Sequence, residues 1–194
     1  RQGDLVAYSG NSGASGGPHL HYEIRHADSE KPVNPLLFDF GAADDIRPVF
    51  ERLVVYPVAK SSSVNGQNKM KKFNVEGGSG KFFISPGSPI SIYGPAGFGV
   101  KTYDLLNDSY NKCAVYSTEL KVDSVTIFKY VMDEFAFSES RYINSHIDYQ
   151  SYIVENTYYE RTFILPNDKL SLYDVGLNRG IFNFGGNEEH LVEI

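Results

Sequence analysis

Turn signals recur at short intervals through most of this 194-residue chain, and they leave little room for long helices. From residue 46 onward, runs rich in Val, Ile, Thr, Tyr and Phe alternate with short polar or Gly-containing breaks such as Gly77-Gly78-Ser79-Gly80 and Asn107-Asp108-Ser109. β-branched and aromatic residues favour pleated, half-buried strands, and many short strands between regular turns are typical of antiparallel sandwiches. The sequence therefore predicts an all-β chain.

The C-terminal region, residues 46–194, is predicted to be an immunoglobulin-like β-sandwich. We expect an exposed loop over residues 61–68 and strands over residues 50–58, 71–76, 82–85, 89–93, 99–106, 112–122, 124–132 and 158–165. One helix is expected over residues 138–149, because Ser138 can cap its first turn and Tyr142, His146 and Tyr149 recur at helical spacing. Residues 190–194 have the pattern of a strand without a closing turn.

Several isolated polar residues of this region receive ordinary interpretations. The single cysteine, Cys113, excludes an internal disulfide, and its alternating surroundings favour a small core residue over a reactive thiol. His146 with Asp148, and His190 after two glutamates, lack spaced partners, so they are interpreted as exposed residues rather than metal ligands. The 14 Tyr and 13 Phe are interpreted mainly as core, with a sugar-stacking surface as the alternative.

The N-terminal region contains one motif with chemical content, the segment from Gly10 to Glu23. Its glycines predict a tight loop before Pro18, and the following residues alternate polar and apolar as a half-buried strand does. At a period of two, His19 and His21 lie on one face, and Leu20, Tyr22 and Ile24 on the other. Two imidazoles at this spacing can reach one metal ion or one water molecule.

This motif, with the exit Pro32-Val33-Asn34-Pro35-Leu36, closely resembles the C-terminal half of the lysostaphin-type (M23) zinc endopeptidase domain. These enzymes cut the cross-linking peptides of bacterial peptidoglycan. The resemblance implies a partial M23 β-fold over residues 1–41, joined to the sandwich near residues 41–47. The order and length of the two regions also resemble cell-envelope M23 proteins of Bacteroidetes-type bacteria, which implies a location in the bacterial cell envelope, periplasmic or exported.

The resemblance assigns roles to the two histidines. It implies that His21 is a Zn²⁺ ligand and that His19 is the catalytic residue, acting on the bound water or the developing oxyanion. The family draws its other two ligands from an upstream His-x-x-x-Asp and a further His from a Gly-His-Leu segment, and neither occurs in these 194 residues. We therefore expect the chain alone to bind zinc weakly and to be inactive, and we expect upstream sequence or a partner chain to complete the site.

Other functional motifs fit the same residues less well. The run from Gly13 to Gly17 fits a Gly-x-Ser-x-Gly nucleophile elbow formally, but a proline and a strand follow it where an elbow needs a helix. No phosphate-binding or dinucleotide pattern fits the glycines. The main alternative to a peptidase is a non-catalytic binding or regulatory module of the cell envelope, in which the histidine pair holds no metal.

The net charge of the chain limits the classes of molecule that it is expected to bind. A formal net charge of −6 disfavours binding to nucleic acid or to anionic lipid, since both require a basic surface. Peptidoglycan peptides remain compatible with an acidic protein. The sequence has no apolar run long enough to span a bilayer and no signal peptide, while a first residue of Arg rather than Met indicates that further sequence precedes it.

Overall fold

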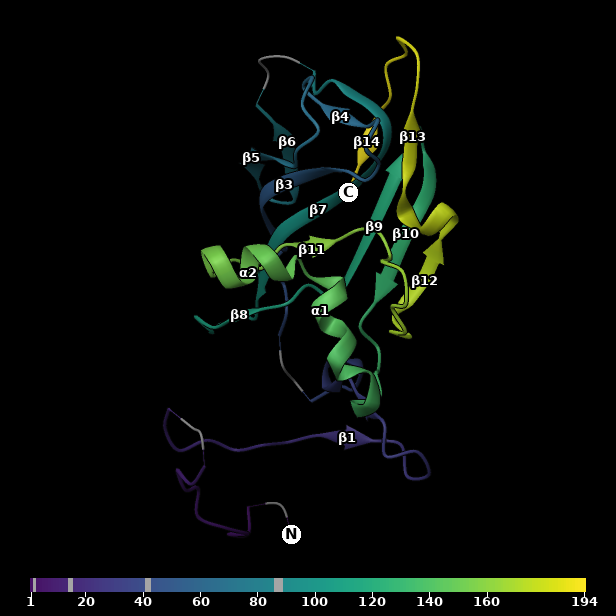
Figure 1. Cartoon of the computed structure of the whole chain (residues 1–194). Coiled ribbons are helices and arrows are strands. Elements are labelled where there is room, and N and C mark those ends of the chain that lie inside the picture. Colours follow the sequence, from purple (N-terminus) through teal and green to yellow (C-terminus); the bar gives the residue numbers. More distant parts are fainter. Residues whose placement is uncertain (2, 14–15, 41–42, 86–88) are drawn as a thin grey trace.

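The computed structural model describes residues 1, 3–13, 16–40, 43–85 and 89–194, and in these ranges the protein is mainly β with short helices. Figure 1 shows strands stacked in the upper body and an N-terminal segment that extends away from it. The predicted all-β class is confirmed in part, since the chain is mainly β and its sheets are antiparallel, but it also contains short helices. Ser15 of the formal nucleophile elbow and Gly41-Ala42 of the predicted junction lie outside the described residues.

The larger sheet is built around β7 (Ile92–Leu105), which pairs antiparallel with β3 (Val49–Pro57) along most of its length. The sheet continues from β3 to β5 (Lys71–Gly78) and β6 (Lys81–Ile84), as the Gly77–Gly80 turn predicts. Short strands complete the pairing of β7: β4 (Ser63–Val64), β8 (Lys112–Cys113), β11 (Glu160–Arg161) and β13 (Phe182–Phe184).

The smaller sheet has the order β12 (Tyr173–Gly176), β10 (Val125–Val131), β9 (Ser117–Val122) and β14 (Val192–Glu193). The β9–β10 hairpin turns at Asp123-Ser124, where both residues have positive φ, 51° and 67°. A two-residue turn of this kind matches the twist of paired strands. The strand expected at the C-terminus is confirmed by the pairing of Val192 with Val122.

One hydrophobic core joins the two sheets. It takes Val55 and Phe98 from the larger sheet and Leu120, Phe128 and Tyr130 from the smaller one, all nearly inaccessible to water. Packing against this core is close: a Cβ added at Gly97 would lie 2.4 Å from the Phe163 ring. Two antiparallel sheets that enclose one core form a sandwich.

The helical region differs from its prediction in detail. A 3₁₀ segment (Phe137–Tyr142) runs into α1 (Ile143–His146), and a second helix, α2 (Tyr149–Glu155), follows. The chain breaks between the helices because Ile147 is extended and bridges to Glu160, while Asp148 caps α2 by accepting a hydrogen bond from the Ser151 backbone N–H. The single helix over 138–149 capped by Ser138 is therefore wrong.

Three further predictions for this region are wrong. Residues 61–68 are not simply an exposed loop, because β4 pairs with β7 and Val64 is fully buried. Cys113 is exposed rather than a core residue. A strand is expected over residues 158–165, but only the two residues of β11 form one. They pair with Gly99 and Val100 of β7.

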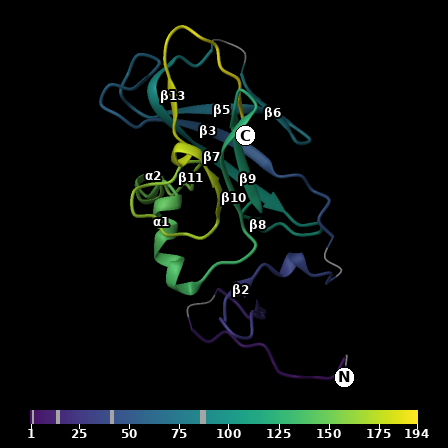
Figure 2. The same ribbon diagram turned by 90° about the vertical axis from the view of Figure 1, so that its right-hand side faces the viewer.

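The N-terminal segment is held at its far end by a small hairpin. β1 (Ile24–Arg25) pairs with β2 (Pro32–Val33), and a 3₁₀ turn (Pro35–Leu37) follows. Asn34 fixes this hairpin to the sandwich: its backbone N–H donates to the Asp133 carbonyl at 2.7 Å and its side chain to the Met132 carbonyl at 3.1 Å. The rotated view in Figure 2 shows the same hairpin beneath the sheets.

The strand predicted from His19 begins later than expected, at Ile24. Leu20 is 85% exposed and Tyr22 59%, so the prediction that they face a core is wrong in this chain. A strand needs a neighbour for its backbone hydrogen bonds, and none of the strands in the described ranges lies beside residues 18–23.

Candidate functional site

His19 and His21 lie together on the exposed N-terminal segment. Their ring centroids are 4.8 Å apart and the ring planes are inclined by 53°. The Nδ1 atom of His19 is 2.9 Å from the Gly17 carbonyl oxygen. A carbonyl can only accept, so Nδ1 carries a hydrogen, and in the neutral ring the lone pair is then on Nε2 of His19. The structure thus brings the two predicted site residues into contact and sets the tautomer of one.

The local sequence explains this geometry. Gly13 has a φ of +84°, a conformation that suits glycine, and Gly16-Gly17-Pro18 leads from the loop into an extended chain. The proline restricts the residue before it to extended conformations, which directs the Gly17 carbonyl close to the His19 ring. Both histidines remain accessible to solvent.

The pair fits part of a zinc site. Neutral imidazole nitrogens are zinc ligands, and a catalytic zinc takes three protein ligands. Within the described ranges, no group of three or more His, Cys, Asp or Glu side chains could hold a metal ion. The carboxylate of Glu23, two residues after His21, accepts a hydrogen bond from Arg25 Nε at 2.7 Å. The motif therefore provides at most two imidazole nitrogens, fewer than the three protein ligands that a catalytic zinc takes.

His26 has a structural role. Its Nε2 lies 2.6 Å from Glu134 Oε2, and Lys31 Nζ lies 2.8 Å from Glu134 Oε1. Hydrogen bonds from Lys31 first and then His26 lower the pKa of the Glu134 carboxyl. These contacts attach the β1–β2 hairpin to the sandwich, so His26 and Glu134, which the sequence analysis did not single out, place the segment that carries the histidine pair.

His146 and Asp148 were predicted to be exposed, and this is wrong, because both are almost fully buried. The Nδ1 atom of His146 is 3.4 Å from the Tyr173 hydroxyl, and its Nε2 has no hydrogen-bond partner among the described residues. Burial lowers the pKa of His146 from 6.5 to about 4. His146 is therefore a neutral base enclosed by aromatic rings at neutral pH.

A buried polar cluster surrounds this position. Asp148 accepts hydrogen bonds from Tyr56 at 2.9 Å and from the Ser151 hydroxyl at 3.1 Å, and it pairs with Arg161 at 3.3 Å. The Tyr130 hydroxyl donates to Glu160, whose pKa is nonetheless raised by burial. Each buried polar group needs such partners because unpaired burial is costly. Sequence reasoning missed the cluster, since its members come from four separated segments.

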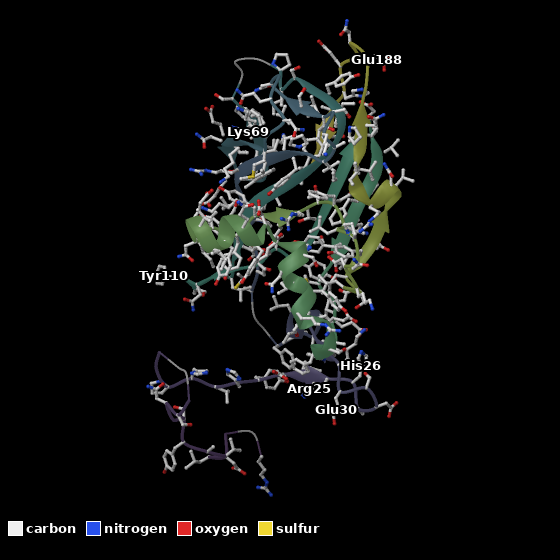
Figure 3. The ribbon with its side chains drawn as sticks, in the orientation of Figure 1. Arg25, His26, Glu30, Lys69, Tyr110 and Glu188 are labelled. Atoms are coloured by element: carbon white, nitrogen blue, oxygen red, sulfur yellow. The ribbon has the colours of Figure 1, made fainter. Side chains whose placement is uncertain are left out.

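His190, predicted to be exposed, is partly buried against Phe182 and Phe184, and this prediction is also wrong. Its Nδ1 lies 2.6 Å from an Asp123 carboxylate oxygen, and this hydrogen bond is the main cause of a lowered pKa at Asp123. The contact holds the segment around His190 against the β9–β10 turn. In Figure 3 the neighbouring Glu188 lies at the end of the molecule opposite Arg25 and His26.

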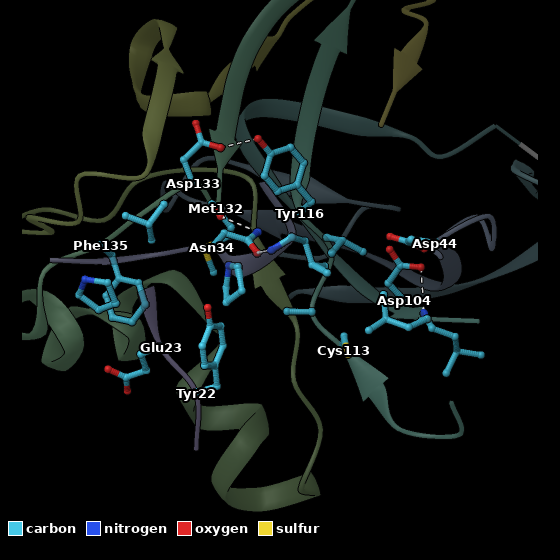
Figure 4. A pocket seen from close by; sticks show the side chains of 18 of the residues that line it. Tyr22, Glu23, Asn34, Asp44, Asp104, Cys113, Tyr116, Met132, Asp133 and Phe135 are labelled. Atoms are coloured by element: carbon cyan, nitrogen blue, oxygen red, sulfur yellow. Dashed lines mark hydrogen bonds between the residues drawn. The ribbon is translucent and has the colours of Figure 1, made fainter. Parts of the chain in front are cut away.

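A pocket of about 470 Å³ lies where the hairpin meets the sandwich, and we call it the junction pocket. Figure 4 shows Tyr22 and Asn34 on one side of it and Asp44, Asp104 and Cys113 on another. No pattern in the sequence indicates this pocket, because its walls come from segments about a hundred residues apart. Its lining consists of Tyr22, Glu23, Pro32, Val33, Asn34, Pro35, Leu36, Asp44, Asp104, Leu105, Leu106, Cys113, Ala114, Val115, Tyr116, Met132, Asp133, Phe135 and Phe137.

Comparisons with protein-family models, with curated proteins and with solved structures found no match for this chain. None of the helices in the described ranges is long and apolar enough to cross a membrane.

Proposed function

We propose that residues 1–41 are the C-terminal part of a lysostaphin-type zinc endopeptidase domain that acts on peptidoglycan peptides in the bacterial cell envelope. In this proposal His21 is a zinc ligand and His19 is the catalytic residue. The observation that carries it is the contact between two exposed imidazoles, 4.8 Å apart, directly after a glycine loop. The immunoglobulin-like assignment of residues 46–194 belongs to the same proposal, supported by the core between two antiparallel sheets.

The two histidines have different roles in the proposed reaction, proton transfer for His19 and metal binding for His21. His19 is oriented through Nδ1 by the Gly17 carbonyl, so its Nε2 can take a proton from a nucleophilic water and return it to the leaving amine. His21 supplies a neutral nitrogen to the metal. When bound, Zn²⁺ supplies Lewis acidity, which activates water near neutral pH and polarises the scissile carbonyl.

The proposal requires ligands from outside these 194 residues. Two imidazoles do not complete a catalytic zinc site, and the resemblance indicates a His-x-x-x-Asp pair as the source of the rest. Residues 18–23 are suited to receive such a segment, since their exposed backbone and the Leu20 and Tyr22 side chains can pair with and pack against another strand.

Zinc titration of the 194-residue chain tests the ligand assignment. We expect binding weaker than about 1 µM, because two ligands leave the ion largely hydrated, with ring-proton NMR shifts confined to His19 and His21. His21→Ala abolishes these shifts, whereas the matched control His190→Ala, at a histidine that contacts Asp123 and not the N-terminal hairpin, preserves them. Submicromolar zinc binding by this chain alone contradicts the incomplete site, and zinc-induced shifts at other histidines instead contradict the assignment.

A second candidate function is a binding module of the cell envelope. Three tyrosines around α2 favour it: the Tyr152 and Tyr158 rings are 4.5 Å apart, Tyr149 lies 6.2 Å from Tyr152, and Tyr149 and Tyr158 are exposed. Aromatic faces exposed in this way can stack on sugars. Co-sedimentation with purified peptidoglycan that is lost in Tyr158→Ala, and retained in Tyr110→Ala, would support this function without any role for the histidines.

A further inference from the structure

We propose that the junction pocket binds a peptide segment that carries a lysine-like ammonium group next to an apolar side chain. This goes beyond the proposed peptidase activity, because it needs no metal at His19 and His21. Three properties of the pocket favour such an occupant: its apolar walls, its acidic lining, and a volume that is open to solvent and larger than one side chain.

The walls of the junction pocket are apolar and partly open to water. Leu105, Val115 and Met132 form its inner surface, while Phe137 and Leu36 at its edges remain 54% and 52% exposed. Concave apolar surfaces with a few polar groups are where proteins bind ligands. An apolar side chain placed here would remove both its own surface and that of the walls from water.

The charged groups of the lining are all acidic. Glu23, Asp44, Asp104 and Asp133 contribute carboxylates, and the described lining residues include no Lys, Arg or His. Two of these carboxylates have partners, since Glu23 pairs with Arg25 and Asp133 accepts a hydrogen bond from the Tyr116 hydroxyl.

Asp44 and Asp104 both line the pocket and appear on the same side of it in Figure 4, where their segments are joined by the hydrogen bond from the Asn107 backbone N–H to the Ala43 carbonyl at 3.3 Å. Asp104 accepts a hydrogen bond from the Leu105 backbone N–H at 2.9 Å, and neither carboxylate forms a salt bridge within the described part of the chain. The nearby cation Lys112 is directed to Glu51 and the Tyr103 ring instead. Two adjacent carboxylates without a cation attract a positive group, and a compact ammonium can interact with both.

The occupant follows from these features together. A lysine-like side chain can lay its aliphatic stem along the apolar wall and place its ammonium between Asp44 and Asp104. The pocket is larger than one side chain, and it is open to solvent, so a neighbouring apolar residue of the same peptide can occupy the part near Met132 and Phe135. A peptide provides both groups at the required spacing.

Cys113 provides a direct reporter of occupancy. It is the only cysteine of the chain, it is exposed, and it lines the pocket beside Asp104. A bound peptide should shield it from a maleimide. The probes are the tripeptide acetyl-Leu-Lys-Leu-amide, the same peptide with norleucine in place of Lys, and butylamine. Labelling rates are compared with and without each probe within one variant, so that a change in intrinsic thiol reactivity cancels.

We expect the lysine peptide to protect Cys113 with about tenfold higher affinity than the norleucine peptide, and butylamine to protect least. Partly exposed ion pairs each change affinity by a factor of up to about 5, so two carboxylates account for this difference. In the double variant Asp44→Asn/Asp104→Asn the advantage of lysine falls to within about twofold. The control Glu188→Gln/Glu189→Gln removes the same charge from the opposite end of the molecule and should preserve it (Figure 3).

Three results overturn the proposal. Equal protection by the lysine and norleucine peptides shows that the pocket does not distinguish a charged side chain from a neutral one. Equal protection by butylamine and the lysine peptide shows an ammonium site without peptide recognition. Loss of the lysine advantage in the control variant shows a general effect of net charge. None of these three results bears on zinc binding by His19 and His21. The zinc titration therefore tests the peptidase proposal separately.

Discussion

Replacing His146 should change how the stability of this protein depends on pH. His146 is almost fully buried, with a pKa of about 4 in the folded chain against an ordinary 6.5. Between these values the unfolded chain binds a proton that the folded chain does not, so the free energy of unfolding falls as pH falls from about 6.5 to 4. At about 1.36 kcal/mol per pH unit, the loss from this residue approaches about 3 kcal/mol at pH 4.

The assay is urea unfolding, followed by circular dichroism, at intervals from pH 7.5 to pH 4. The variant His146→Phe keeps an aromatic ring in the site and removes both the titrating group and the unpartnered Nε2. Wild type should lose about 3 kcal/mol more than this variant over the range, whatever the absolute stability of the variant.

Other groups close to His146 also contribute to the pH dependence of stability that this experiment measures. Tyr130 from β10 and Tyr173 from β12 contact its ring, and Asp168 raises its pKa while Arg161 lowers it, both less than burial does. Glu160, reached through Tyr130, has a raised pKa and thus opposes the histidine, since its stabilising effect is lost as pH rises. The control His21→Gln, at an exposed site, should keep the wild-type slope. Identical slopes in wild type and His146→Phe would refute the reasoning.

Two other substitutions test packing and charge. Gly97→Ala should cost about 1–3 kcal/mol of stability, because its Cβ would lie 2.4 Å from Phe163, whereas Gly185→Ala, with no atom within 4 Å, should be close to neutral in the same urea assay. Arg161→Met should lower the free energy of unfolding by about 3 kcal/mol, because it leaves Asp148 buried without its cation. Adding Asp148→Asn should recover part of this loss. A lack of recovery would argue against the ion pair as the cause.

The local features of this fold could be predicted from sequence where one short segment decides the outcome. The Gly77–Gly80 and Asn107–Ser109 turns each join strands that pair in the structure, β5 with β6 and β7 with β8. Gly77 and Gly80 in one turn and Asp108 in the other have positive φ, a conformation that glycine and aspartate adopt in tight turns without any distant contact.

Features that depend on distant partners could not be predicted. Val64 is fully buried because β4 pairs with β7, which lies almost thirty residues further along the chain. His146 is buried because Tyr130 and Tyr173 enclose it, and nothing in its own neighbourhood indicates this. Of the candidate site, the closeness of His19 and His21 follows from their spacing, whereas the junction pocket depends on the docking of Asn34 against Met132 and Asp133.

The central position of β7 has a consequence for how the chain folds during synthesis. One edge of β7 pairs with β3, which is made earlier, and the opposite edge pairs with β11 and β13, because Val100 faces both Leu53 and Glu160, and Ala96 both Pro57 and Phe182. The second edge therefore remains open for several seconds while residues up to 184 are translated. An unpaired edge in a partly made sheet is a template for pairing with other nascent chains. Slowing translation between residues 105 and 184 should therefore increase the dependence of this protein on chaperones that bind nascent chains.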